Sequence, residues 1–195
     1  MSSDENQVNE IIKKELDNLG LKPDFSKDLG IESIYNMEIY ADKLWKTYVK
    51  IDMLEYTYPT QIDLIKERAL ELIRNYSLIN EEIGNKLLKQ KTESEEQRNI
   101  FEEKAAEKFV IAARKVFYFL QGKGIKSSCL VEAKDGVKSF VSSKSEYHHI
   151  RELIEKSQSI FEDLAVYHIS KNNYELAHLY YFLLGELLIK EIYYG

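Results

Sequence analysis

Two Glu-x-x-His pairs are the residues of this chain whose types and spacing come nearest to metal chemistry. Glu146 stands three residues before His149, and Glu175 stands three residues before His178. On a helix such positions share a face, and di-iron bundles combine two such pairs with two further carboxylates. In a ferritin-like chain another carboxylate-bearing helix separates the pairs, whereas here they fall on consecutive predicted helices. We therefore expect solvent-facing side chains, without a metal or any other cofactor, and keep a di-iron bundle as an alternative.

Two further stretches contain reactive or anion-binding residue types. Cys129 is the single cysteine, and no basic cluster or helix N-terminus precedes it that would lower its pKa. We expect it to fill space in a packed strand. The segment "GKGIKSS" carries Lys123 and Lys126 but lacks the spacing of a phosphate-binding loop. We therefore expect no catalytic residues and a non-enzymatic protein.

Composition limits the class of protein. A chain of 195 residues with 44% hydrophobic residues has the size of one folded domain, and we expect a single helical domain over residues 1–195. The net charge of −6 gives no general attraction to nucleic acid. One cysteine indicates a reducing compartment, and the longest apolar run, residues 179–189, is too short to cross a bilayer. We predict a cytoplasmic protein with no membrane contact.

Steps of three and four between apolar residues predict helices through most of the chain. An N-terminal helix and connector occupy residues 1–30, and a second helix runs from about 34 to 55. A third follows Pro59, with a bend or break expected near Gly84 because glycine disfavours helix interiors. Thr92 and Glu95 have the spacing of a capping box before a long helix whose inner side begins at Ile100.

The stretch after that helix departs from the helical period. Asp135-Gly136 lies between two runs of small and β-branched residues, a pattern typical of a hairpin turn. We predict a β-hairpin at about 127–143, within an insertion spanning residues 121–146. Residues 147–195 then form a C-terminal helical hairpin. The fold class is mainly α, a bundle of six or seven helices with one small β-hairpin.

Residues 160–193 resemble a single tetratricopeptide-like helical hairpin. The matching positions are Leu164, Ala165, Tyr174, Ala177, Tyr181 and Gly185. The resemblance implies two antiparallel helices that approach closely at Ala177 and Gly185, with Leu164 and Tyr181 beside them. No second copy follows, and an array needs roughly three repeats to form its binding surface, so the resemblance implies the local shape alone.

The same hairpin is also similar to that of HEPN-type domains, several of which are ribonucleases or partners of nucleotidyltransferases. Nuclease members carry an Arg four to six residues before a His. No Arg precedes His168 or His178 at that spacing. We transfer no catalytic residues, and a HEPN-like ribonuclease is a further alternative.

Aromatic residues crowd the C-terminal helices and are our candidate contact residues. They are Tyr167, Tyr174, Tyr180, Tyr181, Phe182, Tyr193 and Tyr194. Because three of them are consecutive, one side of the helix must serve the core while another is left for the surface or a partner. Tyrosine is favoured at interfaces. We predict an interaction or assembly subunit of a cytosolic complex, with a protein partner or a second copy of itself.

A subunit that handles nucleic acid in replication, repair or RNA processing is the alternative from another class. Its contact surface would be the lysines of residues 86–91 together with those of the predicted hairpin. The hairpin lysines are Lys123, Lys126, Lys134 and Lys138. The net charge of the chain does not favour this alternative.

Overall fold

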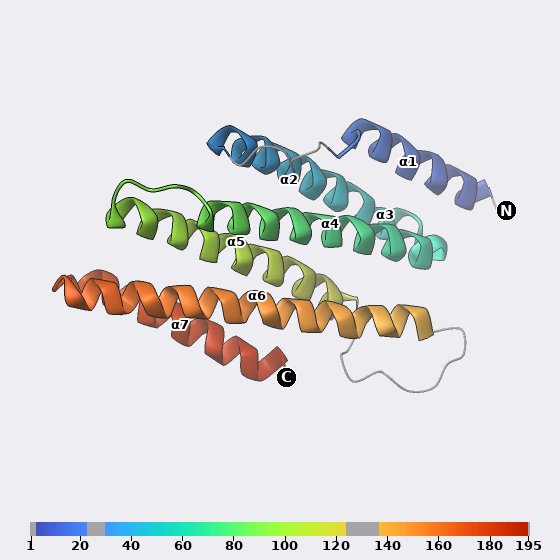
Figure 1. The fold of residues 1–195 in the computed structure, drawn as a ribbon. Coiled ribbons are helices and arrows are strands. Elements are labelled where there is room, and N and C mark those ends of the chain that lie inside the picture. The colour runs from blue at the N-terminus through green and yellow to red at the C-terminus, as the bar shows by residue number, and fades with distance from the viewer. Residues whose placement is uncertain (1–2, 23–29, 124–136, 195) are drawn as a thin grey trace. The chain divides into compact units, whose positions relative to one another are not determined.

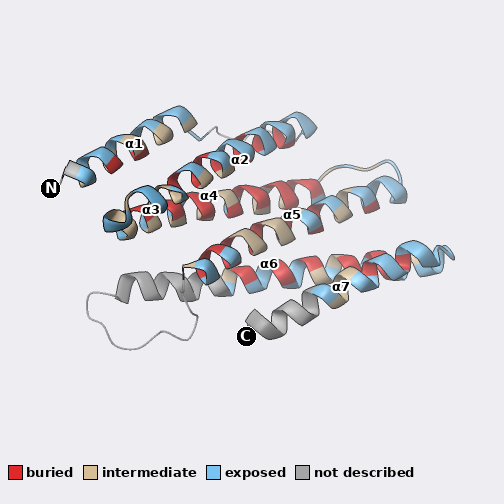
Figure 2. Cartoon of the chain, turned by 180° about the vertical axis from the view of Figure 1, so that it is seen from behind, coloured by how far each residue is buried: buried red, intermediate tan, exposed pale blue. Residues whose placement is uncertain are grey.

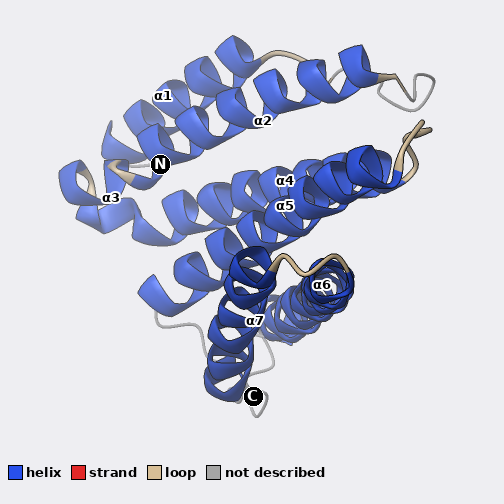
Figure 3. Ribbon diagram, turned by 90° about the vertical axis from the view of Figure 1, so that its left-hand side faces the viewer, coloured by secondary structure: helices blue, strands red, loops and turns tan. Residues whose placement is uncertain are grey.

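The computed structural model describes the backbone of residues 3–22, 30–123 and 137–194, and the side chains of these residues except 3, 137–147 and 187–194. All regular structure in these ranges is helical (Figures 1 and 3). The elements in chain order are α1 (Ser3–Leu19), α2 (Ile31–Asp52), α3 (Leu54–Thr57), η1 (Pro59–Gln61), α4 (Ile62–Leu88), α5 (Glu95–Gly122), α6 (Val137–Ser170) and α7 (Tyr174–Tyr194). The mainly α prediction is confirmed.

The predicted β-hairpin is wrong in its second strand. Residues 137–143 form the first turns of α6, and the described ranges contain no strand. Val137, Phe140 and Val141 are spaced i, i+3 and i+4, which is a helical period that the β-branched composition obscured. The predicted first strand, residues 127–133 with Cys129, lies outside the described residues.

The chain divides into two compact units, residues 1–79 and residues 80–195, and α4 contributes to both. The single domain over residues 1–195 therefore stays a prediction. In the first unit α1 packs along α2, and Lys50 of α2 forms a 2.7 Å ion pair with Glu15 of α1. The indole of Trp45 lies 5.0 Å from the ring of Tyr48 and 5.5 Å from that of Tyr76, between ring centroids.

Helix α4 passes through Gly84 without interruption, so the predicted break there is wrong. A Cβ built on Gly84 would lie 2.5 Å from Cε1 of Phe109, a fully buried residue of α5. Glycine is present because the ring of Phe109 occupies the space where a side chain would stand. Close packing therefore decides the residue at this position.

Ser94, and not Thr92, caps α5. The Ser94 hydroxyl accepts a 3.1 Å hydrogen bond from the backbone N–H of Gln97, and the Gln97 side chain accepts one of 2.9 Å from the backbone N–H of Glu93. This resembles the reciprocal arrangement of a capping box, with the second bond donated by the residue before the N-cap. The predicted signal is thus present two residues later than expected.

In the second unit α6 packs extensively against α5 and against α7. Its contact with α5 includes fully buried Ser157, whose hydroxyl lies 2.9 Å from the Leu153 carbonyl oxygen and 3.2 Å from that of Ala106. The small side chain lets the two backbones approach at this crossing. Figure 2 shows buried residues along α5 and α6, while much of the described part of α7 is exposed.

Candidate interaction surface

A tight turn sets α7 beside α6. Asn172 adopts the left-handed conformation, with φ of 57°, and its side-chain oxygen accepts a 3.0 Å hydrogen bond from the Tyr174 hydroxyl. Short polar side chains such as asparagine tolerate this backbone region. The turn reverses the chain within three residues, so that α7 returns along α6 (Figure 3).

The packing between α6 and α7 differs in part from the expected one. Leu164, Ala165 and Ala177 are buried. A Cβ at Gly185 would meet no atom within 4 Å, so this glycine does not permit a close approach. Tyr181 is exposed, and Tyr180 fills the inner space instead, stacked on Phe161 with ring centroids 6.0 Å apart.

The consecutive aromatic residues of α7 face different ways, as predicted. Tyr180 is 3% exposed, whereas Tyr181 and Phe182 are 45% and 58% exposed. Tyr174, one helical turn before His178, is 64% exposed and falls on the same side of α7 as Tyr181. We call Tyr174, Tyr181 and Phe182 the outer face of α7.

The other predicted contact residues lie elsewhere. Tyr167 is half-buried near the end of α6, where the Lys171 ammonium group lies 5.3 Å from its ring centroid. The side chains of Tyr193 and Tyr194 are outside the described residues. Tyr180 belongs to the core of the second unit, which leaves the outer face as the exposed part of the predicted set.

A second surface, which the sequence reasoning missed, is a groove between α5 and α7. A cavity of about 400 Å³ opens there, and we call its lining the α5–α7 groove. Its walls are formed by Glu103, Glu107, Val110, Ile111 and Arg114 of α5 and by Leu183 and Glu186 of α7, with Phe161 of α6 at its base.

Carboxylates near the groove act on the Tyr180 phenol. Burial is the largest cause that raises the pKa of Tyr180 to about 12, and the negative charge of Glu103, which accepts a hydrogen bond from the Tyr180 hydroxyl, adds to it. Glu107 raises this pKa further. The neutral phenol is thereby held as a hydrogen-bond donor to Glu103, which lines the groove.

The Glu-x-x-His residues do not come together. Glu175 and His178 are exposed on α7, as expected, and the Glu146 side chain lies outside the described residues. His149 departs from expectation: it is half-buried, with Nε2 3.3 Å from Oε2 of Glu81. Within the described ranges, no three His, Cys, Asp or Glu side chains form a group suited to a metal ion.

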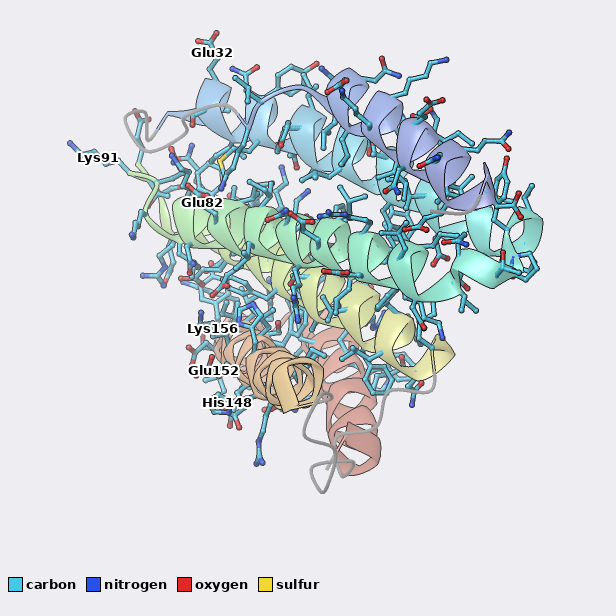
Figure 4. The ribbon with its side chains drawn as sticks, turned by 90° about the vertical axis from the view of Figure 1, so that its right-hand side faces the viewer. Glu32, Glu82, Lys91, His148, Glu152 and Lys156 are labelled. Carbon is cyan, nitrogen blue, oxygen red and sulfur yellow. The ribbon has the colours of Figure 1, made fainter. Side chains whose placement is uncertain are left out.

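The polar side of α6 next to His149 carries a row of charges. Lys156 forms a 2.8 Å ion pair with Glu81 of α4, and His148 lies 3.4 Å from Glu152. Figure 4 shows His148, Glu152 and Lys156 along α6. Exposed pairs of this kind contribute about 0–1 kcal/mol each, so the row is a solvated helix surface.

The structure describes only part of the predicted lysine surface. Lys86 is 6% exposed and so is not available to a phosphate backbone, while Lys89 and Lys91 are exposed. The Lys123 ammonium group lies 5.6 Å from the ring centroid of Phe119. Lys126 and Lys134 and the side chain of Lys138 are outside the described residues.

No protein-family model, curated protein or solved structure matches this chain. The tetratricopeptide-like and HEPN-like resemblances therefore stay predictions. None of the helices in the described ranges has an apolar stretch long enough to span a bilayer.

Proposed function

We propose that this protein is a non-enzymatic subunit of a cytoplasmic protein assembly, and that the outer face of α7 is a contact surface. The observation that carries the proposal is the exposure of Tyr174, Tyr181 and Phe182, at 64%, 45% and 58%, on one helix. Large aromatic residues grouped on an exposed surface mark interaction sites more often than single apolar residues do.

The pattern of α7 supports the same reading. Apolar residues lie all round this helix, a distribution typical of helices that are covered on every side. Among the described side chains of α7, Ala177 and Tyr180 are the buried ones and form one stripe, and the sides that carry Leu179 and Phe182 remain 44% and 58% exposed. A partner that covers these sides would bury the apolar residues of α7 that the second unit leaves exposed.

The test compares two matched substitutions in the full-length chain. Tyr181→Asp changes the outer face, and Tyr35→Asp makes the same substitution on α2; the two side chains are 45% and 61% exposed. Light scattering over a range of concentrations measures self-association. Affinity capture from native cells, followed by reconstitution with the purified captured protein, measures binding to a partner.

We expect the wild type to self-associate or to bind a reconstituted partner, and Tyr181→Asp to weaken that association about 10-fold or more, as loss of an interface aromatic does. Tyr35→Asp should leave it unchanged. A wild-type protein that stays monomeric and binds no reconstituted partner contradicts the proposal. Equal effects of the two substitutions would also contradict it.

A further inference from the structure

The stripe of α5 that lines the groove continues beyond the cavity in both directions. On α5, Ile100 and Tyr118 continue the stripe of Glu107, Ile111 and Arg114, and are 47% and 56% exposed. From Ile100 to Tyr118 this stripe runs about 27 Å, at about 1.5 Å per residue. That length matches about five turns of a bound helix.

The wall contributed by α7 has the same character. Leu176 and Leu179 are 37% and 44% exposed and precede Leu183 by seven and four residues, so the three lie on one side of the helix. Tyr174 and Tyr181 lie on a different side, because Tyr181 and Leu183 are two residues apart and point about 200° from one another. Phe182 follows Leu179 by three residues and borders the groove. Tyr181 and the α5 wall of the groove can therefore be altered separately.

Four of the eight residues that line the cavity are apolar, and the cavity has room for side chains. A cavity of about 150 Å³ accommodates a benzene molecule, so the 400 Å³ here has room for roughly two or three large apolar side chains. Val110, Ile111 and Leu183 are half-buried around this space. Helices α5 and α7 both pack on α6 and leave the groove between them, and a groove of this kind is a docking site for another amphipathic helix.

The charges at the groove select the occupant. Glu103, Glu107 and Glu186 place three carboxylates there against the one guanidinium group of Arg114. An apolar helix without cations would remove water from the exposed Glu107 carboxylate without replacing that interaction, which is unfavourable. A lysine or arginine beside the apolar stripe of an occupant would pair with Glu107. A second copy of this acidic chain, with its net charge of −6, is a poorer match.

We infer that the α5–α7 groove binds an amphipathic helix of a partner protein, one with an apolar stripe flanked by lysine or arginine. The inference rests on the proposed function, since it names the chemistry of a partner, but it concerns a different surface. The partner helix places its apolar side chains between Val110, Ile111 and Leu183, and a cation next to Glu107.

The experiment selects binders from a displayed library of random 18-residue peptides, with the full-length protein as bait. Binders that are also retained by an Ile111→Arg variant are removed, after its helical circular dichroism has been shown to match the wild type. We expect the enriched peptides to carry apolar residues at i, i+3 or i+4, and i+7, with a surplus of lysine and arginine. Their affinity should fall as salt rises.

Single substitutions then locate the site. Glu107→Lys should weaken the selected peptides about 10-fold or more, because it replaces an exposed attractive charge by a repulsive one. Asp163→Lys makes the same change of charge at an exposed position of α6 that does not line the groove, and it should have little effect on peptide affinity. Because Glu107 is exposed, its replacement leaves the core intact.

Each outcome separates this inference from the proposed function. Failure to enrich peptides, enrichment of peptides without basic residues, or equal effects of Glu107→Lys and Asp163→Lys would overturn the inference. Loss of assembly in Tyr181→Asp with no peptide binding at the groove would support the proposed function and overturn the inference. Peptide binding at the groove without any assembly in native cells would support the groove as a binding site and contradict the proposed function.

Discussion

Replacing Gly84 by alanine would raise the helix propensity of this position but would also crowd the packing against Phe109, so the two effects on stability oppose each other. In an exposed helix interior, Gly→Ala stabilises by about 1 kcal/mol. At Gly84, however, the new Cβ would lie 2.5, 2.8 and 3.0 Å from three ring carbons of Phe109. Phe109 is fully buried, and the Lys156 ammonium group lies 5.5 Å from its ring centroid. The ring therefore has little room to move.

Overpacking of this kind costs about 1–3 kcal/mol, so Gly84→Ala should lower the free energy of unfolding by about 0–2 kcal/mol. Gly185→Ala is the matched control, because a Cβ there meets no atom within 4 Å. It should stabilise α7 by about 1 kcal/mol. Urea unfolding followed by helical circular dichroism measures both variants, which should differ by about 1–3 kcal/mol.

The Phe109→Leu background tests the cause. With a smaller side chain opposite, Gly84→Ala should become neutral or stabilising, giving a coupling energy of about 1 kcal/mol or more in the double-mutant cycle. If Gly84→Ala is as stable as Gly185→Ala, or if Phe109→Leu does not change its effect, the argument from close packing is refuted.

Three further predictions follow from the contacts of the second unit. Ser94→Ala should lower the free energy of unfolding by about 1 kcal/mol through loss of the α5 cap, while Thr92→Ala should leave it unchanged; urea midpoints of the two variants compare the sites directly. Ser157→Ala should lower the free energy of unfolding by less than about 1 kcal/mol, whereas Ser157→Leu should lower it by about 1–3 kcal/mol by overpacking the crossing with Ala106. Thermal midpoints measure both variants, and similar midpoints would contradict this packing. The folded state holds the Tyr180 proton up to a pKa of about 12, whereas the unfolded state releases it near pH 10, so the free energy of unfolding should fall between pH 10 and 12. The urea midpoint of Tyr180→Phe should depend less steeply on pH in that window than that of the wild type. Parallel pH profiles would contradict the raised pKa of Tyr180.

The sequence predicted most helices because their patterns are local. The apolar steps of α2 and of α6 after residue 147 mark faces that are buried in the structure, including Met37 and Leu44 on α2 and Leu153 and Ile154 on α6. The positions where prediction failed depend on contacts between distant residues. The propensity of Gly84 favours a break, but the ring of Phe109, which packs against that position, lies 25 residues further along the chain.

The start of α6 shows a different limit. Asp135-Gly136 and the β-branched residues after it are typical of a hairpin, yet Val137, Phe140 and Val141 are also spaced for a helix. Short apolar stretches carry both periods, and local propensity does not choose between them. The structure continues α6 back to Val137, which adds ten residues to the first helix of the predicted C-terminal hairpin.

The apolar steps of α5 predict one inner side that begins at Ile100, and this is why they do not indicate the α5–α7 groove. In the structure Ile100 is 47% exposed and belongs to the groove stripe. Val110 and Ile111, adjacent to buried Phe109 and Ala112, were the available signal: four consecutive residues with large or small apolar side chains cover more than one face of a helix. A helix with a second apolar stripe, bordered by Glu103, Glu107 and Arg114, has a second surface to cover. In this chain α6 covers the first stripe and α7 flanks the second, so the bound helix that we infer would supply the burial that the sequence of α5 specifies.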